Sequence, residues 1–599
     1  MPMRIPMHRF QYTKLGRDQI GSKLSTVEAT GPQSASAFST ALSGKTLRIV
    51  TKNGPTLEYR FGTNRTLSLT EGGKQVSAGY GELALDQIVF FSHLIPGEQK
   101  GYNVFVDQRT NLATVFEVWL SSGIKQGTGE NQFALDDREV QRQIYFGHVD
   151  NGQPAPEELH HYSNRMSGKG FYWKQDTGVE TIELYTSVAN TNFVELTRHV
   201  DDLSYVATSD FVMVDDRYFF YDRTECEFSG IHTCFALDLM GEKQVGVRFG
   251  FNENDELEYY LFRGKGKVVG QVAHLVPFDE HGKVPMFAQP PANSTSTSAA
   301  SPQKGARTTY RPIRTFTHMT DEQVHEAAER RTAAFGVADA ADIAPQAAAN
   351  IYNMPFSDIL VGKTFTLRYD HGGPVRDYRV TDKNKLQFRD HRENVWHTTE
   401  YRAYEGDDNL AWFSHIIPGS KPRASVQVAV DFDNGLTTSI ESHMGTAYYG
   451  NETSYRAVFG VVEMAGIEAP LYLRHSFTDE LVGNVFSWTY GGTTAQHTYI
   501  SPHSMSWTIY TANQTAGAQW CSPCIFTKLR PGVYLFCQNE EACNGVQMIE
   551  LVNTKIAHDC GFSYNGGARG VSLSPVGAKG RHIGKFDIAD YFVPGRRSV

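Results

Sequence analysis

A glutamate and a histidine stand two residues apart near position 440, where they could handle a proton together. In an extended strand, residues i and i+2 project from the same face, so Glu441 and His443 should share one face. Tyr455 and Arg456 open the next strand expected from the sequence. A carboxylate, an imidazole, a phenol and a guanidinium in one place could bind a phenol or a carboxylate and move one proton without a metal. We therefore take these four residues as candidate catalytic residues.

A related set occurs in the first half of the chain. On the strand expected over residues 113–120, Glu117 and Trp119 share one face and the opposite face is apolar. A carboxylate in such dry surroundings must be paired, or its pKa rises. Arg142 and Tyr145 follow in the place that Tyr455 and Arg456 take in the second half. Glu117 is therefore a further candidate catalytic residue, with Trp119, Arg142 and Tyr145 as ligand contacts. The alternative is structural: Glu117 and Glu441 form ion pairs with Arg142 and Arg456 that close the sheet.

A seven-residue motif containing a histidine occurs twice. Phe91–Gly97 returns as Phe413–Gly419 about 320 residues later, with six of seven positions identical. Each motif ends in Pro-Gly, a turn signal, so His93 and His415 should lie near strand ends. Each ring either caps backbone groups of the turn or contacts a ligand. Tyr404 and Trp412 flank the second motif and are further candidate ligand contacts.

The motif belongs to a longer internal repeat. Gly44-Lys45-Thr46-Leu47 matches Gly362-Lys363-Thr364-Phe365, and Gly168–Trp173 matches Gly483–Trp488. The matches keep their order along the chain, which chance would not produce. The sequence therefore predicts two homologous halves of roughly 250 residues each.

Most of both halves follows the period-two pattern of β-strands. Leu57, Tyr59 and Phe61 alternate with polar residues, and turn signals such as Asn53-Gly54 and Gly491-Gly492 separate the strands. Each half divides into two β-rich blocks of about 110 residues, enough for about eight strands that close around a small ligand. We expect an all-β chain of four small antiparallel barrels in two homologous pairs, with a few short helices. Sandwiches are the competing all-β option.

The expected domain boundaries follow from this division. A Pro/Ser/Thr/Ala-rich stretch at 286–310 is typical of a flexible linker. A helix is expected over Asp321–Phe335, because Thr320 and Gln323 form a capping box. The full division is an N-terminal extension at 1–38, N-type barrels at 39–155 and 358–468, C-type barrels at 156–285 and 469–599, the linker at 286–310 and a helical connection at 311–357.

Composition excludes several classes of function. A net charge of −10 argues against wrapping nucleic acid, and the apolar runs are too short to span a membrane. Seven cysteines with one CxxC, at Cys521 and Cys524, fit buried thiols better than a zinc site or a disulfide framework. No P-loop, HExxH, nucleophile elbow or dinucleotide fingerprint occurs. We expect no metal, no cofactor and a cytoplasmic location.

Several of these segments resemble the family called molybdenum cofactor biosynthesis protein F. The likeness lies in the Gly-Lys-Thr-Phe strand opener, the Tyr378-Arg379 strand, the segment Trp412–His415 and the Gly-x-x-Phe-x-Trp motif of Gly483–Trp488. The resemblance implies two fused copies of a pair of calycin-like barrels. The wider barrel class includes phenolic acid decarboxylase, in which tyrosines, an arginine and a glutamate act on a hydroxycinnamate. The sequence shows no Gly-rich phosphate loop before a helix and no basic cluster suited to a pterin phosphate.

Two classes of function remain. The first is a cofactor-independent barrel enzyme that acts by acid/base chemistry on a small apolar or aromatic metabolite, of lyase, decarboxylase, isomerase or cyclase type. The second is a non-catalytic carrier, or an accessory protein of molybdenum cofactor biosynthesis as the family name suggests. Tyr221, Arg223 and Glu225 share a strand face and are matched to Cys537, Asn539 and Glu541, so the halves should not carry one identical site. We expect the halves to pack as an intramolecular pseudo-dimer, with a homodimer as a further option.

Overall fold

The computed structural model is an all-β protein of four closed, eight-stranded antiparallel barrels. As predicted, these barrels form two homologous pairs. The structure describes residues 17–120, 125–126, 133–134, 140–187, 190–197, 204–225, 230–252, 255–273, 342–343, 352–420, 424–444, 453–491, 493–509, 519–540, 546–567 and 570–593. The predicted linker at 286–310 and the predicted helix over Asp321–Phe335 lie outside the described residues.

The first half forms the first and second barrels. The first barrel is closed by β2 (Thr46–Thr51), β3 (Thr56–Phe61), β4 (Thr66–Glu71), β5 (Lys74–Leu85), β6 (Ile88–Leu94), β7 (Lys100–Asp107), β8 (Leu112–Leu120) and β11 (Val140–Val149). The second barrel consists of β13 (Lys169–Gln175), β14 (Glu180–Leu184), β15 (Asn190–Glu195), β16 (Tyr205–Met213), β17 (Tyr218–Thr224), β18 (His232–Asp238), β19 (Lys243–Phe251) and β20 (Leu257–Gln271), which pairs with both β13 and β19.

The second half repeats this arrangement strand by strand. The third barrel is closed by β22 (Thr364–Tyr369), β23 (Val375–Val380), β24 (Lys385–Asp390), β25 (Val395–Asp407), β26 (Leu410–Ile417), β27 (Ala424–Asp431), β28 (Leu436–Met444) and β29 (Thr453–Glu463). The fourth consists of β31 (Asn484–Tyr490), β32 (Thr493–Ser501), β33 (Ser504–Ile509), β34 (Gln519–Arg530), β35 (Val533–Glu540), β36 (Val546–Asn553), β37 (His558–Gly567) and β38 (Gly570–Lys585), which pairs with both β31 and β37.

Short elements complete the sheets. β1 (Gln33–Ser34) runs parallel to β20, and β21 (Asp342–Ile343) runs parallel to β38. β12 (His161–Tyr162) pairs with β16, and β30 (Ser476–Phe477) pairs with β34. β9 (Lys125–Gln126) and β10 (Phe133–Ala134) pair with each other. The helix α1 (Arg17–Thr30) packs Ile20 and Leu24 into the core between the first two barrels. The 3₁₀ helix η3 (Ala589–Phe592) lies near the end of the described chain. No helix among the described residues is long and apolar enough to cross a membrane.

Strand alternation builds the barrel interiors. On β3, Leu57, Tyr59 and Phe61 are buried in the core of the first barrel, whereas Glu58 and Arg60 are exposed. The repeated Pro-Gly turn has the same backbone in both halves, because Gly97 and Gly419 have φ of 79° and 71°, a left-handed conformation that favours glycine. The predicted period-two pattern and the repeat are therefore both confirmed.

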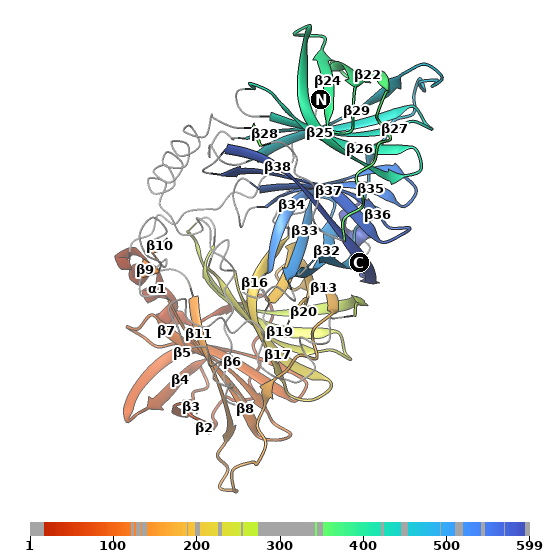
Figure 1. Ribbon diagram of the computed structural model, residues 1–599. Coiled ribbons are helices and arrows are strands. Elements are labelled where there is room, and N and C mark those ends of the chain that lie inside the picture. The colour runs from red at the N-terminus through yellow and green to blue at the C-terminus, as the bar shows by residue number, and fades with distance from the viewer. Residues whose placement is uncertain are drawn as a thin grey trace, which may run out of the picture.

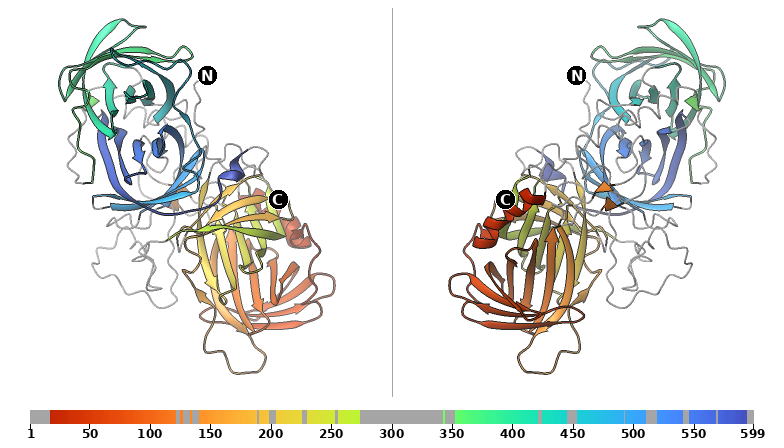
Figure 2. Two further views of the ribbon diagram at one scale, coloured as in Figure 1. Left: turned by 90° about the vertical axis from the view of Figure 1, so that its right-hand side faces the viewer. Right: turned by 90° about the vertical axis from the view of Figure 1, so that its left-hand side faces the viewer.

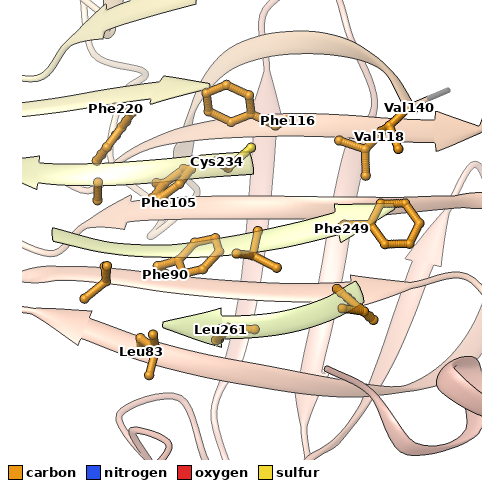
Figure 3. Packing of buried hydrophobic residues seen from close by; sticks show 14 of the residues in the cluster. Leu83, Phe90, Phe105, Phe116, Val118, Val140, Phe220, Cys234, Phe249 and Leu261 are labelled. Carbon is orange, nitrogen blue, oxygen red and sulfur yellow. The ribbon is translucent and has the colours of Figure 1, made fainter. Parts of the chain in front are cut away.

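The outer faces of neighbouring barrels pack together within each half. Phe105 stacks on Phe90 from its own barrel and on Phe220 from the second barrel, with ring centroids 4.6 and 4.5 Å apart. Figure 3 shows these rings with Cys234, Phe249 and Leu261 between the two sheets. Strands at this contact bury both faces, one toward their own barrel interior and one toward the neighbouring barrel.

The C-type barrels also join the two halves. The second and fourth barrels lie in the middle of the molecule and the first and third lie at its ends (Figures 1 and 2). Ala273 N–H donates to the carbonyl of Ile583 (3.0 Å), and Asp587 N–H donates to that of Val269 (2.6 Å). The strand registers make Val269 equivalent to Ile583 and Ala273 to Asp587, so the contact is reciprocal.

Candidate functional site

A carboxylate held between two arginines lies in the interior of the third barrel. Glu441, on β28, accepts a hydrogen bond from Arg376 Nη2 at 2.5 Å and forms a close ion pair with Arg456, its cross-strand neighbour on β29. The side chains of Glu441 and Arg376 are 4% and 5% exposed, and that of Arg456 is 35% exposed. Burial alone would raise the pKa of Glu441, but the two guanidinium groups outweigh it and lower the pKa below the ordinary value. Glu441 is therefore an ionised group that holds both arginines.

Arg376 retains hydrogen-bonding capacity inside this barrel. Its Nε lies 3.4 Å from Asp390 Oδ2, on β24, and Asp390 in turn accepts from Arg392 Nη2 at 3.0 Å. The Nη1 of Arg376 is buried and has no hydrogen-bond partner among the residues that the structure describes. A buried donor without a partner costs free energy of about 1–3 kcal/mol, and more for a charged group. The arrangement therefore leaves a guanidinium N–H available to a ligand.

His443 and Tyr369 border the same cluster. By strand alternation, His443 projects from the same face of β28 as Glu441. It is half-buried, and burial lowers the pKa of its imidazole. The ring is therefore neutral near pH 7 and able to accept a proton. Tyr369 Oη lies 3.4 Å from Thr437 Oγ1, also on the interior face of β28.

The histidines of the repeated motif lie deeper, each paired with a tyrosine. His415 Nε2 lies 3.2 Å from Tyr378 Oη, and His93 Nε2 lies 3.2 Å from Tyr59 Oη. Both rings also place Nδ1 toward the carbonyl of the next residue, as a cap on the strand end would. Burial lowers the pKa of His415 to about 3 and that of His93 to about 4, so both are neutral. Arg376 and Tyr378 are two residues apart on β23, so the Tyr378–His415 pair lies on the same strand face as the charged cluster of the third barrel.

The first barrel keeps the glutamate and changes its partners. Glu117 accepts from Tyr145 Oη at 2.9 Å and pairs with Lys100 Nζ at 2.7 Å. Trp119 lies on the same face of β8, opposite Lys100 in the strand register. Leu57 takes the position that Arg376 has in the third barrel. The first barrel therefore lacks the buried arginine with its free N–H.

Four of the candidate residues lie outside the barrel interiors, which corrects their predicted grouping. Arg142 points to the second barrel, where it pairs with Asp222 and, at 2.9 Å, with Asp210. The predicted ion pair between Glu117 and Arg142 is therefore wrong. The predicted ion pair between Glu441 and Arg456 is confirmed. Tyr455 donates to the carbonyl of Cys537 in the fourth barrel. Tyr404 and Trp412 pack on Phe562 of the fourth barrel, with centroid distances of 5.4 and 6.1 Å. The odd spacing of these residues from the interior residues puts them on the opposite strand faces.

Comparison with known proteins agrees with the architecture. Residues 346–446 match the MoaF N-terminal domain, and residues 475–585 match the MoaF C-terminal domain. Both matches lie in the second half of this chain, in the order of the two domains. The Arg376–Glu441 cluster lies in the segment that matches the MoaF N-terminal domain, and the first half repeats the strand order of the second.

Other comparisons add little. None of the curated protein sequences matches the chain. One similar solved structure is that of a putative beta-lactamase from Burkholderia vietnamiensis. It is 16% identical, the match covers 17% of this chain and 95% of that one, and the TM-score is 0.15.

Two polar clusters in the C-type barrels were not predicted as sites. In the second barrel, Glu183 accepts from Arg223 Nη1 at 2.7 Å, from Tyr185 at 3.3 Å and from Tyr221 through a short bond. In the fourth barrel, one tyrosine bridges two carboxyl groups on β36 and β37. These side chains come from different strands, and only the strand register, which the sequence alone does not show, brings them together.

That register also corrects one sequence match. Phe211 pairs with Tyr221, as Phe526 pairs with Phe536. Tyr221 and Arg223 are therefore equivalent to Phe536 and Gln538, one residue before the predicted matches Cys537 and Asn539. Glu225 is likewise equivalent to Glu540 and not to Glu541.

Metal and phosphate chemistry find little support in the described part of the chain. No group of three or more His, Cys, Asp or Glu residues there is placed to hold a metal ion. The described cysteines are buried: Cys234, Cys521, Cys524, Cys537 and Cys560. Arg376, Arg456, Lys100 and Arg223 are each paired with a carboxylate, so these clusters do not fit the doubly charged phosphate of a pterin.

Proposed function

We propose that the chain is a cofactor-independent enzyme whose third barrel binds a small aromatic or apolar molecule bearing one carboxylate or phenolate. The observation that carries the proposal is the free Nη1 of Arg376, a guanidinium nitrogen buried inside the barrel. An anion on this nitrogen would satisfy the donor and gain a charge-assisted hydrogen bond.

The charge of the cluster supports an anionic ligand. Among the described residues, the guanidinium groups of Arg376, Arg456 and Arg392 face two carboxylates, those of Glu441 and Asp390. The cluster therefore carries one net positive charge if Arg392, which is 59% exposed, is counted. A single carboxylate would neutralise it. A doubly charged phosphate would not be matched.

The surrounding side chains support an aromatic or apolar ligand body. Phe388, Phe413, Val426 and Val428 are buried in the same interior, with ring centroids of Phe388 and His415 4.6 Å apart. Eight-stranded barrels are wide enough for one small ligand. The interior therefore offers apolar walls around one charged anchor, which is the usual composition of a small-molecule site.

The proton would be handled by His443. Its neutral imidazole accepts a proton from a carbon adjacent to an unsaturated group, and the electron pair delocalises toward the carboxylate held at Arg376. Return of the proton to another carbon gives an isomerase, and loss of a leaving group gives a lyase. Glu441 positions the arginines and stays ionised, because its pKa is lowered.

The test follows binding and proton removal separately. The probe is trans-4-phenylbut-3-enoate, which has acidic α-protons, dissolved in D₂O. Deuterium uptake by the probe is measured by mass spectrometry, and its affinity for the protein by calorimetry. We expect the natural protein to bind and exchange, His443→Gln to bind without exchange, and Arg376→Leu to lose both. Lys100→Met in the first barrel is the matched control and should change neither. Binding without exchange would contradict the enzyme and leave a carrier; binding unaffected by Arg376→Leu would contradict the site.

A further inference from the structure

Two carboxyl groups lie together in the interior of the fourth barrel. Glu550, on β36, and Asp559, on β37, are 0% and 1% exposed. The hydroxyl of Tyr490, on β31, lies 3.3 Å from Glu550 Oε1 and 3.2 Å from Asp559 Oδ2. The backbone N–H of Ala578 donates to the other oxygen of Asp559. One phenol and one amide therefore serve two buried acids.

No cation compensates this pair among the residues that the structure describes. Neither Glu550 nor Asp559 forms an ion pair there, and Glu550 Oε2 has no hydrogen-bond partner at all. Burial raises the pKa of Glu550 to about 7 and raises that of Asp559 well above its ordinary value. Burial thus disfavours the charge on both groups, and buried carboxyls with strongly raised pKa values are typical of functional sites.

Two further polar side chains of the same interior each have one atom without a hydrogen-bond partner in the described part of the chain. His497 is 4% exposed, and its Nδ1 forms no hydrogen bond; its ring centroid lies 6.1 Å from that of Tyr490 and 6.2 Å from that of Phe536. The side-chain oxygen of Gln538, which is 2% exposed, is unpartnered too. The pKa of His497 is lowered by burial to about 3, so the ring adds no positive charge. Trp488 Nε1 and Tyr499 Oη are also without partners, so the interior has unmet donors as well as unmet acceptors, but no cation among the described residues offsets its two acids.

The second barrel shows how the same fold compensates a buried carboxylate. There Glu183 is paired with Arg223 at 2.7 Å. The strand registers place Gln538 at the position of Arg223 and His497 at that of Glu183. The fourth barrel thus keeps two acids while its strand β35 presents a neutral amide where the second barrel has its arginine.

We propose that the interior of the fourth barrel is a binding site for a small organic ammonium ion carried on an aromatic or apolar body. An ammonium group supplies both the missing positive charge and N–H donors for Glu550 Oε2 and its neighbours. Trp488, Tyr499, Phe526 and Phe536 line the same core, and aromatic faces attract organic cations. The site is separate from the anion site of the third barrel, and the two would take ligands of opposite charge.

The experiment compares a cation with its neutral isostere. Binding of 2-phenylethylammonium and of 2-phenylethanol to the full chain is measured by calorimetry at pH 8. We expect the ammonium to bind and the alcohol to bind at least tenfold more weakly. Glu550→Gln should lower ammonium affinity at least tenfold while leaving the melting temperature unchanged or higher, because the variant removes an uncompensated buried charge.

Controls separate the site from general effects. Glu480→Gln removes a carboxylate from the exterior of the same barrel, where it pairs with Lys528, and should leave ammonium binding unchanged. Asp559→Asn gives a second, independent loss of charge if Glu550→Gln does not fold. Arg376→Leu should leave ammonium binding intact. The anion site of the third barrel and the ammonium site of the fourth are therefore tested independently, and either can fail without the other. Absence of ammonium binding, equal binding of the alcohol, or full affinity in both acid variants would overturn the proposal.

Discussion

Removal of the charge of Glu441 should destabilise the third barrel far more than the same change at Glu117 destabilises the first. Glu441→Gln leaves Arg376 buried, with only Asp390 at 3.4 Å to compensate it. Loss of one partner from a buried ion pair costs about 3–5 kcal/mol. Glu117→Gln leaves Lys100 with Glu71, 3.6 Å away, and the Lys100 side chain is already 25% exposed, so the cost should be about 1 kcal/mol.

Hydrogen exchange is the suitable assay, because a chain of four barrels does not unfold as a single two-state unit. At about 1.4 kcal/mol per factor of ten, amides of β23 and β28 should exchange at least 100-fold faster in Glu441→Gln. Amides of β3 and β8 should exchange about fivefold faster in Glu117→Gln. The double variant Arg376→Leu/Glu441→Gln should recover most of the protection, because it also removes the buried cation. It places a leucine at position 376, where the first barrel has the equivalent residue Leu57. Equal effects in both barrels, or no recovery in the double variant, would refute the reasoning.

Three further outcomes are expected. Trp412→Ala should destabilise the contact with the fourth barrel by about 3–5 kcal/mol, read by thermal unfolding, without weakening carboxylate binding at low temperature, because the ring lies outside the barrel interior. The third barrel should lose protection as the pH falls from 6.5 toward 4: the folded pKa of His415, about 3, lies below the unfolded value, so protonation favours unfolding. The fourth barrel should show the opposite trend and lose protection as the pH rises from 4.5 to 7, because two acids there, Glu550 with a folded pKa of about 7 and Asp559 with a raised one, outweigh the lowered pKa of His497. Exchange rates corrected for intrinsic chemistry would show both trends in one sample, and parallel trends would contradict them.

The sequence predicts the fold well because two signals reinforce each other. Alternation such as that of Leu57, Tyr59 and Phe61 fixes strands locally, and the repeat of Phe91–Gly97 fixes the duplication. Closure into barrels follows from the number of strands in each block.

The site is predicted only in part, because many strands have two buried faces. β26 is buried along nearly its whole length, so composition does not show which face meets the barrel interior and which meets the next barrel. Spacing would have separated them: Trp412 and His415 are three residues apart, and Tyr455 and Arg456 are adjacent, so each pair lies on opposite faces.

Arg376 was missed for a different reason. It lies on a strand distant in sequence from Glu441, and its equivalent in the first half is Leu57, so the repeat draws no attention to it. Only the closed sheet brings β23 across the barrel from β28. A charged pair formed across a barrel interior leaves no periodic signal in a single sequence.

The most direct test of the anion site is a crystal structure of the protein with 3-bromocinnamate, located by the anomalous signal of bromine. The account predicts one bromine inside the third barrel and a carboxylate oxygen within hydrogen-bonding distance of Arg376 Nη1. An empty third barrel at saturating ligand, or a carboxylate bound away from Arg376, would contradict it.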